Sequence, residues 1–410
     1  NGKNIDFQPI SAVHKHIRQN SVLQVKLRSG FDTYITENHS LFSFGSDSSL
    51  VPSVPRDNLF VHIAGTAPNY ELHEKIDVVE ELLKNAPKKE LSHIYCSVMN
   101  LNQSRIRILK TDLKFLNCLK NGINSIGQIA NNAKIDFSTS SDCAKRLAKQ
   151  KYIISEKSGR FNFCNLTLEG EKYFDTLTLL LNNCKYWKGK YRISLDAVSI
   201  MNIGCNAFDI LVGVHYGKSF VPRFLELNDY LCDFMGLYVS EGHSRYKGKS
   251  GEVYLAGQKR EMQKRMADSI SKGLLLNPRI TWRGVHADAQ IAHHLVKYAF
   301  SCGIGAYNKQ VPDIIYTAPT SKKWRFLEAY CAGDGHITKE MIVLTTASRK
   351  LASGLLLLLR QLGVRKLSCY KQNTVYRVCI FETTPLAKIK EKKTKRSYYD
   401  NVPTALSSES

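Results

Sequence analysis

Eleven cysteines are scattered through this 410-residue chain, and none forms a CxxC pair or a Cys/His ligand spacing. The sequence therefore supports neither a zinc site nor a disulfide framework, and its cysteines are typical of buried thiols in a reducing compartment. No apolar run approaches 18 residues and no signal peptide is present, so we expect a cytoplasmic location and no membrane partner. The chain starts at Asn1 rather than at Met, which indicates an excised or processed piece.

Acidic side chains are also scarce. The 36 Asp and Glu residues face 58 Lys and Arg residues, which gives a formal net charge of +22. Such an excess favours a polyanionic partner, and nucleic acid is the foremost candidate. A basic solvated surface, or a ribosomal type of housekeeping protein, remains an alternative. The length and the 43% hydrophobic content predict two to four domains with substantial cores.

Two similar stretches, at residues 234–242 and 327–335, organise the chain. Each is an apolar run that ends on an acid followed by glycine, and the two acids are Glu241 and Asp334. The apolar spacing predicts a helix in both places. If the two helices pack side by side, the carboxylates meet at one end, where they could bind a divalent cation.

Small residues lie four positions apart in both runs: Gly236 and Ser240 in the first, Ala329 and Gly333 in the second. They give each helix a face that another backbone can approach closely. Gly242 and Gly335 then follow as helix stops, which we expect to adopt the left-handed conformation that glycine tolerates.

The two runs belong to a longer internal repeat. Their acids lie 93 residues apart (334 − 241). After the first acid come a predicted strand at 253–256 and a predicted helix at 259–275. After the second acid come a strand at 342–345 and a helix at 349–362. A single capped amphipathic helix could imitate one motif, but it would not produce a second copy of the elements that follow.

The paired motifs resemble those of the LAGLIDADG homing endonucleases. The resemblance implies an α+β fold with two pseudo-symmetric αββαββα endonuclease modules, at 226–315 and 316–405. It further implies a monomer that binds double-stranded DNA at a long asymmetric site, with Mg²⁺ (or Mn²⁺) held by Glu241 and Asp334. In the family a basic residue late in each module assists catalysis, and Lys309 matches that place in the first module.

The second module departs from this pattern, because Asp400 stands at the equivalent position. Lys395 and Arg396 are the candidates for the second basic role, and both belong to a basic run that could also contact DNA phosphates or simply face solvent.

Residues 1–75 are predicted to be all-β, beginning with a hairpin of 22–27 and 31–35. Thr36 and His39 follow it and resemble the TxxH block of intein (Hint) splicing domains, where these residues polarise the amide at the upstream splice junction. The alternative is a hydrogen-bonded histidine at a strand end. Because neither a first-residue nucleophile nor a terminal Asn is present, we expect the chain as given not to splice.

Residues 106–185 lie between two connectors, 76–105 and 186–225, and read as three helices, a hairpin and a last helix. This order resembles the winged helix-turn-helix of bacterial and archaeal regulators. The resemblance implies that the third helix enters the major groove and that the wing touches phosphates. The DNA-binding candidates are Lys145, Arg146 and Lys149 on that helix, and Lys157 and Arg160 on the wing. A small helical scaffold with a basic face is the alternative.

Together these features predict an intein-encoded, site-specific endonuclease that makes a double-strand break in DNA by metal-dependent phosphodiester hydrolysis. The runner-up is a non-cleaving descendant of such an enzyme, either a regulator or a maturase-like RNA binder.

Overall fold

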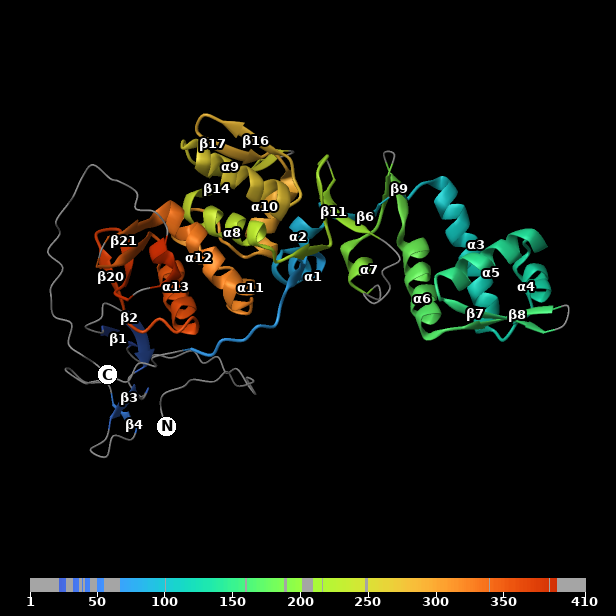
Figure 1. Ribbon diagram of the computed structural model, residues 1–410, viewed down its shortest axis with the longest axis horizontal. Coiled ribbons are helices and arrows are strands. Elements are labelled where there is room, and N and C mark those ends of the chain that lie inside the picture. Colours follow the sequence, from blue (N-terminus) through green and yellow to red (C-terminus); the bar gives the residue numbers. More distant parts are fainter. Residues whose placement is uncertain are drawn as a thin grey trace.

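The chain contains both helices and strands, in agreement with the α+β class (Figure 1). The computed structural model describes residues 22–26, 32–36, 39, 41–44, 50–54, 67–99, 101–158, 161–187, 190–200, 209–215, 217–247, 250–338, 340–382 and 384–388. Small hairpins lie at one end of the molecule and a mainly helical unit lies at the other. Two four-stranded sheets with their helices occupy the region between them.

The hairpins come from the start of the chain. β1 (Val22–Lys26) pairs antiparallel with β2 (Asp32–Thr36), which confirms the hairpin expected there. β3 (Leu41–Phe44) pairs in the same way with β4 (Leu50–Ser53).

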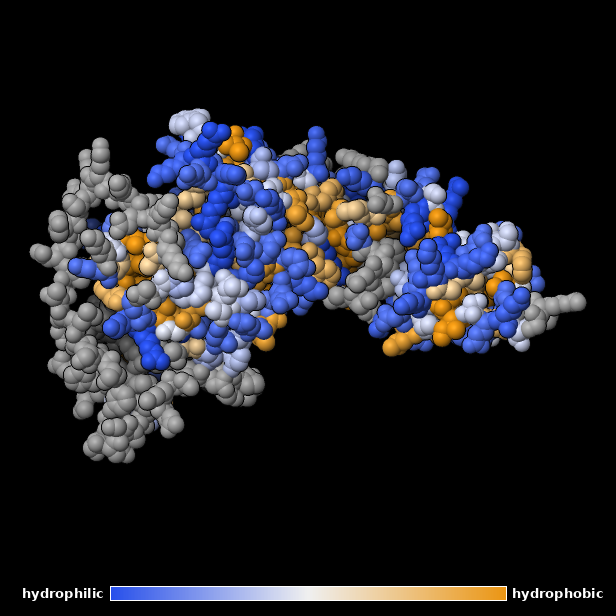
Figure 2. All heavy atoms as spheres, in the orientation of Figure 1, coloured by the Kyte–Doolittle hydropathy of each residue, from blue (hydrophilic) through white to orange (hydrophobic). Residues whose placement is uncertain are grey.

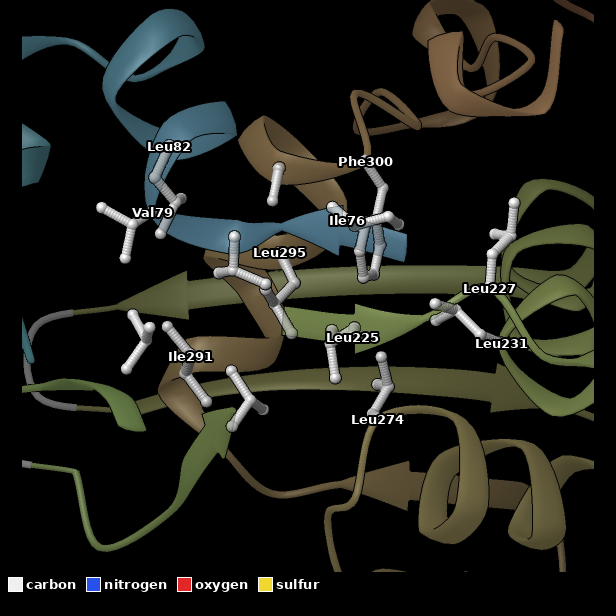
Figure 3. Packing of buried hydrophobic residues seen from close by; sticks show 14 of the residues in the cluster. Ile76, Val79, Leu82, Leu225, Leu227, Leu231, Leu274, Ile291, Leu295 and Phe300 are labelled. Carbon is white, nitrogen blue, oxygen red and sulfur yellow. The ribbon is translucent and has the colours of Figure 1, made fainter. Parts of the chain in front are cut away.

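The segments on either side of the helical unit fold together. They contain β5 (Lys75–Asp77), α1 (Val78–Asn85), α2 (Lys88–Leu91), β6 (Ile94–Val98), α7 (Leu195–Ser199), β11 (Ile210–Val214), β12 (Phe220–Pro222) and β13 (Phe224–Glu226). β12, β11 and β6 form one sheet, and β13 pairs with β5. Figure 3 shows Ile76, Val79 and Leu82 of this region packing with Leu225 and Leu295, so it shares a core with the sheets that follow.

The helical unit comprises α3 (Gln103–Lys120), α4 (Ile126–Ala133), α5 (Phe137–Lys149), β7 (Ile153–Ser158), β8 (Phe161–Leu166) and α6 (Leu168–Asn183). This is the element order that the sequence predicted. The buried side chains of its helices recur at helical spacing, as with Leu109, Phe115 and Leu116 of α3. β9 (Lys185–Trp187) and β10 (Lys190–Arg192) pair as a hairpin after it.

The rest of the chain forms two units of similar order. The first unit contains α8 (Asp229–Glu241), β14 (Gly242–Lys247), β15 (Ser250–Ala256), α9 (Arg260–Asp268), η1 (Ser269–Gly273), β16 (Pro278–Thr281), β17 (Gly284–Ala287), α10 (Gln290–His294) and η2 (Leu295–Ala299). After η3 (Ala306–Asn308) and α11 (Asp313–Tyr316), the second unit contains α12 (Thr320–Asp334), β18 (Gly335–Ile337), β19 (Ile342–Thr346), α13 (Arg349–Gln361), β20 (Leu367–Gln372), β21 (Val375–Ile380) and η4 (Pro385–Lys388). The sheets have corresponding strand orders, β14-β15-β17-β16 and β18-β19-β21-β20.

α8 and α12 pack side by side through their small residues, as predicted. A Cβ added to Gly236 would lie 2.6 Å from the Cβ of Ala329, and one added to Gly333 would lie 2.6 Å from the Cβ of Ser240. Larger side chains would push the helices apart. The four small residues therefore set how near the two helix ends come to each other.

The two glycines after these helices are extended rather than left-handed, so that expectation was wrong. Gly242 has φ −82° and ψ 148°, and Gly335 has φ −94° and ψ 147°. Glycine is needed at these two positions for a steric reason. The backbone passes directly from a helix into a strand at each of them. A Cβ would then lie 2.6 Å from Tyr238 Cα in the first case and 2.8 Å from Cys331 Cα in the second.

Among the helices that the structure describes, none is long and apolar enough to cross a membrane.

Candidate functional site

Glu241 and Asp334 end the two central helices, so the packing of α8 on α12 brings their backbones to the same place. The Cγ of Glu241 lies 2.9 Å from the point where a Cβ on Gly333 would stand, directly before Asp334. The C-terminus of a helix carries partial negative charge. Two helix ends and two carboxylates therefore create a strongly negative region that favours a cation.

Lys309 lies beside both acids. Its ammonium donates hydrogen bonds to the carbonyl oxygens of Tyr238 (2.9 Å) and Ser240 (3.1 Å), in the last turn of α8. The residue is only 7% exposed. Burial lowers its pKa to about 8, while the negative charges of Asp334 and Glu241 act in the opposite direction.

The loop that carries Lys309 is tied to both units. The backbone oxygen of Lys309 accepts a hydrogen bond from Ser348 Oγ (2.7 Å), the residue that caps α13. The next residue, Gln310, donates its backbone N–H to Cys302 (3.0 Å). Tyr238 donates its hydroxyl to the Gly303 carbonyl (3.1 Å), which fixes the other side of the loop. The amine is thus held against α8 by contacts that reach the second unit.

The hydrogen-bond pattern is available to both forms of the amine. A neutral lysine has two N–H donors and one lone pair, whereas the ammonium has three donors and no acceptor. The two carbonyl oxygens accept from both donors of the neutral form or from two of the three donors of the ammonium. With a pKa of about 8, Lys309 can lose and regain a proton near neutral pH.

Carboxylate oxygens are the ligands that hard divalent cations prefer, and Glu241 and Asp334 bring two carboxylates to adjacent helix ends. Among the described residues, Glu252, His286 and Asp288 form a group of three possible metal ligands, whose ligand atoms lie within 4.8 Å of one another. Arg245 forms an ion pair with Glu252 (2.9 Å). Arg279 forms an ion pair with Asp288 (2.5 Å). Arginines therefore already neutralise both carboxylates of that group.

The basic residue expected in the second module has no described counterpart to Lys309. Lys395, Arg396 and Asp400 lie outside the described residues, so the assignment of the basic role in the second unit stays a prediction.

The basic candidates on the helical unit separate into two kinds. Lys145 and Lys149 lie on the exposed side of α5, and Lys145 is 3.6 Å from Asp142 in a solvent-exposed pair. Arg146 points to the other side and pairs with buried Asp112 on α3. Arg146 therefore holds α5 on α3, whereas the two lysines face outward.

On the hairpin of the same unit, Lys157 is exposed on β7, and Arg160 lies outside the described residues. Of the two residues predicted to contact DNA from the wing, the structure therefore places only Lys157.

Thr36 and His39 lie in one turn at the end of β2. The His39 backbone N–H donates to the Thr36 carbonyl (2.9 Å), and the histidine is exposed. The turn brings the two residues close together, and their role in splicing stays a prediction.

Sequence reasoning missed a buried charge that joins three helices. Asp233 of α8 accepts hydrogen bonds from Arg265 of α9 (2.6 and 3.0 Å) and from Arg325 of α12 (2.5 Å). The available signal was an acid between Cys232 and Phe234, inside an otherwise apolar run, where only a paired carboxylate is tolerated.

A second missed contact comes from the segment before β5. Lys323 of α12 is fully buried, and its ammonium contacts the Asn69 side chain. The Glu71 carboxylate accepts hydrogen bonds from the backbone N–H (2.8 Å) and the hydroxyl (2.6 Å) of Thr320, the first residue of α12. Residues 67–73 thus cap the helix that ends at Asp334. No local sequence signal reveals a contact across about 250 residues.

The curated proteins most like this chain include DNA polymerases of archaea. The chain is 26% identical to a DNA polymerase of Thermococcus hydrothermalis over 98% of its own length and 23% of the relative. It is 24% identical to one of Methanocaldococcus jannaschii over 88% of its own length and 22% of the relative. The chain thus spans about a quarter of the length of these relatives.

Among solved structures, the homing endonuclease I-DmoI in complex with DNA and Mn is similar at 14% identity. The match covers 38% of this chain and 90% of that chain, with a TM-score of 0.31. Residues 321–394, which begin in α12, match the family described as LAGLIDADG-like domain. The similarity to that family thus lies in the second of the two units.

Proposed function

We propose that this chain is a site-specific DNA endonuclease that makes a double-strand break by metal-dependent hydrolysis of phosphodiester bonds. Residues 226–315 and 316–405 are its two pseudo-symmetric modules, and each module reads one half of a long asymmetric site as part of a monomer. The observation that carries this proposal is the meeting of Glu241 and Asp334 at adjacent helix ends, beside the buried amine of Lys309.

In this proposal Glu241 and Asp334 hold Mg²⁺ or Mn²⁺. A metal ion held there supplies a more acidic water and neutralises charge on the scissile phosphate. Lys309, in its uncharged form, accepts the proton of the attacking water through its lone pair. The carbonyl oxygens of Tyr238 and Ser240 keep the amine in position while it does so. Tight packing around the loop of Lys309 restricts water, which strengthens these electrostatic interactions.

The helical unit at 103–183 extends the DNA contact as a winged helix-turn-helix. Lys145 and Lys149 present two positive charges on the exposed side of α5, where a recognition helix needs them. Lys157, with Arg160, adds phosphate contacts from the hairpin. Arg146 acts as a positioning residue because it is engaged with Asp112.

We further propose that the nuclease is carried by an intein. Thr36 and His39 then belong to the splicing domain, of which residues 1–75 are a part. The match of 98% of this chain to 23% of a DNA polymerase supports an origin inside a longer protein.

Cleavage of supercoiled plasmid DNA that carries the target site tests the proposal. Linear product should form in Mg²⁺ buffer and disappear with EDTA. Glu241→Gln and Asp334→Asn should each abolish cleavage yet leave site binding within about threefold, because base and phosphate contacts supply most of the affinity. Glu328→Gln is the matched control, an acid on α12 that pairs with Arg325 (3.6 Å) away from the helix end.

Site-specific binding without any cut by the wild-type chain would instead support the non-cleaving DNA- or RNA-binding protein. Cleavage at the wild-type rate by the double variant would refute the assignment of the two acids.

A further inference from the structure

Two exposed side chains, Trp282 and Arg283, form the tip of the hairpin between β16 and β17. Trp282 is 70% exposed, and the guanidinium carbon of Arg283 lies 4.3 Å from the centroid of the indole ring. Single exposed apolar side chains are common on protein surfaces and need no explanation by themselves. Three further features distinguish this tip: its rigidity, its position and the charge around it.

The backbone of the tip is fixed by hydrogen bonds from neighbouring segments. The Arg283 carbonyl accepts hydrogen bonds from the Tyr254 hydroxyl (2.7 Å) and from the Gly257 backbone N–H (2.9 Å). The Gln263 amide on α9 donates to the Thr281 carbonyl (2.9 Å). Since the tip is already ordered, a partner that contacts it loses little affinity to ordering of the loop.

The strand register puts this tip at the catalytic end of the sheet. Gly242, which directly follows Glu241, pairs with Leu255, and the next residue of β15, Ala256, pairs with Gly284. Since neighbouring strands lie about 4.8 Å apart, the tip is about 10–15 Å from the start of β14. The indole is thus within reach of a nucleotide near a phosphate bound at Glu241.

The surroundings of the tip are mainly basic. Lys259 and Arg260 are exposed at the start of α9, close to the tip because Gly257 bonds to Arg283. One exposed acid, Glu261, follows them. Most of the visible surface around β16 and β17 is hydrophilic (Figure 2). An apolar protein surface would leave the charges of these basic side chains unpaired. A nucleic acid offers flat bases for the indole and phosphates for the basic side chains.

We propose, on the basis of the nuclease function above, that this tip is a DNA contact point beside the cut. The Trp282 ring packs against a nucleotide of the bound duplex, and Arg283 pairs with an adjacent phosphate. Aromatic side chains that stack on bases tolerate any sequence, and apolar wedges between base steps bend the duplex. Trp282 would thereby help to bend DNA toward the two acids, without reading a particular base.

Tryptophan fluorescence tests this assignment, since the chain holds only three tryptophans, Trp187, Trp282 and Trp324. The background is the full chain with Glu241→Gln and Asp334→Asn, so that the DNA stays intact. The probe is a 40-base-pair duplex that this chain enriches from a random-sequence library. Acrylamide quenching is compared with and without duplex, and Trp282→Phe identifies the contribution of Trp282.

We expect the duplex to protect Trp282 from quenching. Trp282→Ala should bind about tenfold more weakly, and Trp282→Phe within about threefold of the background. Arg283→Ala should lower the slope of log affinity against log salt by about 0.9. Leu275→Ala is the matched control, because Leu275 is also exposed (56%) but precedes β16 at its other end.

Unchanged quenching together with unchanged affinity of Trp282→Ala would overturn this inference while leaving the nuclease proposal intact. A shift from dimer to monomer in Trp282→Ala, with unaltered DNA binding, would assign the tip to a second copy of the chain instead. A chain that enriches no duplex would refute the proposed function itself.

Discussion

Replacing Lys309 by methionine should separate stability from activity in this protein. Lys309 is 7% exposed, and burial lowers its pKa to about 8, against about 10.4 for a lysine in an unfolded chain. The gap between the two pKa values corresponds to about 3 kcal/mol, which is the cost of keeping the amine charged in the folded state. Methionine removes this cost but also removes two hydrogen bonds to α8.

The pH dependence isolates the charge from the lost hydrogen bonds. Below pH 8 the lysine is charged in both states, and the full cost is present. Between pH 8 and about 10.4 the unfolded chain binds more protons, so the stability of the wild type rises with pH. Above that range the cost is gone. Relative to Lys309→Met, the wild-type free energy of unfolding should therefore rise by about 3 kcal/mol across this window.

Urea unfolding of both proteins at a series of pH values from 7 to 10.5 measures this difference, because other titrating groups are common to the two. In the plasmid assay the wild-type rate should rise with pH up to about 8 and then level off. Lys309→Met should cleave about 100-fold more slowly or worse. Lys309→Arg should also fail, because arginine keeps a charge but cannot give up its proton.

If the difference in unfolding free energy between the wild type and Lys309→Met did not change with pH, the burial of a charged amine at Lys309 would be refuted. Full activity in Lys309→Arg would show that the charge, and not the lone pair, assists the reaction.

Three other perturbations test the contacts around this site. Asp233→Ala should destabilise the chain by about 3 kcal/mol or more in urea unfolding, because Arg265 and Arg325 both lose their buried partner. Asn69→Leu should cost about 1–3 kcal/mol, since it leaves the Lys323 ammonium buried, and adding Lys323→Met should restore most of that loss. Replacing residues 103–183 by a short Gly-Ser linker should weaken DNA binding and flatten its salt dependence by about 0.9 per lost phosphate contact, with cleavage retained at saturating protein; an unchanged slope in filter binding would exclude this unit from the interface.

The internal repeat let the sequence predict the centre of the molecule. Two apolar runs with small residues four apart and a terminal acid predicted α8, α12 and the meeting of Glu241 with Asp334. The strand and helix after each run were also predicted, and the helix at 349–362 agrees with α13 within one residue. These features depend on local periodicity and on steric rules for small residues, which neighbouring positions in the chain reveal.

The conformation of Gly242 and the partner of Arg146 were decided by packing. Gly242 was expected to be left-handed, but it is extended because a strand starts there. In that conformation a Cβ at this position would clash with Tyr238. The arginine lies one position from Lys145 on α5, and only the approach of α3 turns it inward to Asp112. Spacing along a helix shows which residues share a face, but it does not show which face a neighbour covers.

By itself, then, the sequence determined the repeated elements, the basic character of the chain and the acids at the two helix ends. Only the tertiary structure decided that Lys309 loses its solvent and that residues 67–73 cap α12. Burial depends on elements that meet from distant parts of the chain, as Glu71 and Thr320 do, and desolvation is what lowers the pKa of a lysine. The position of Lys309 could be predicted from its motif, whereas its chemistry depended on what packs around it.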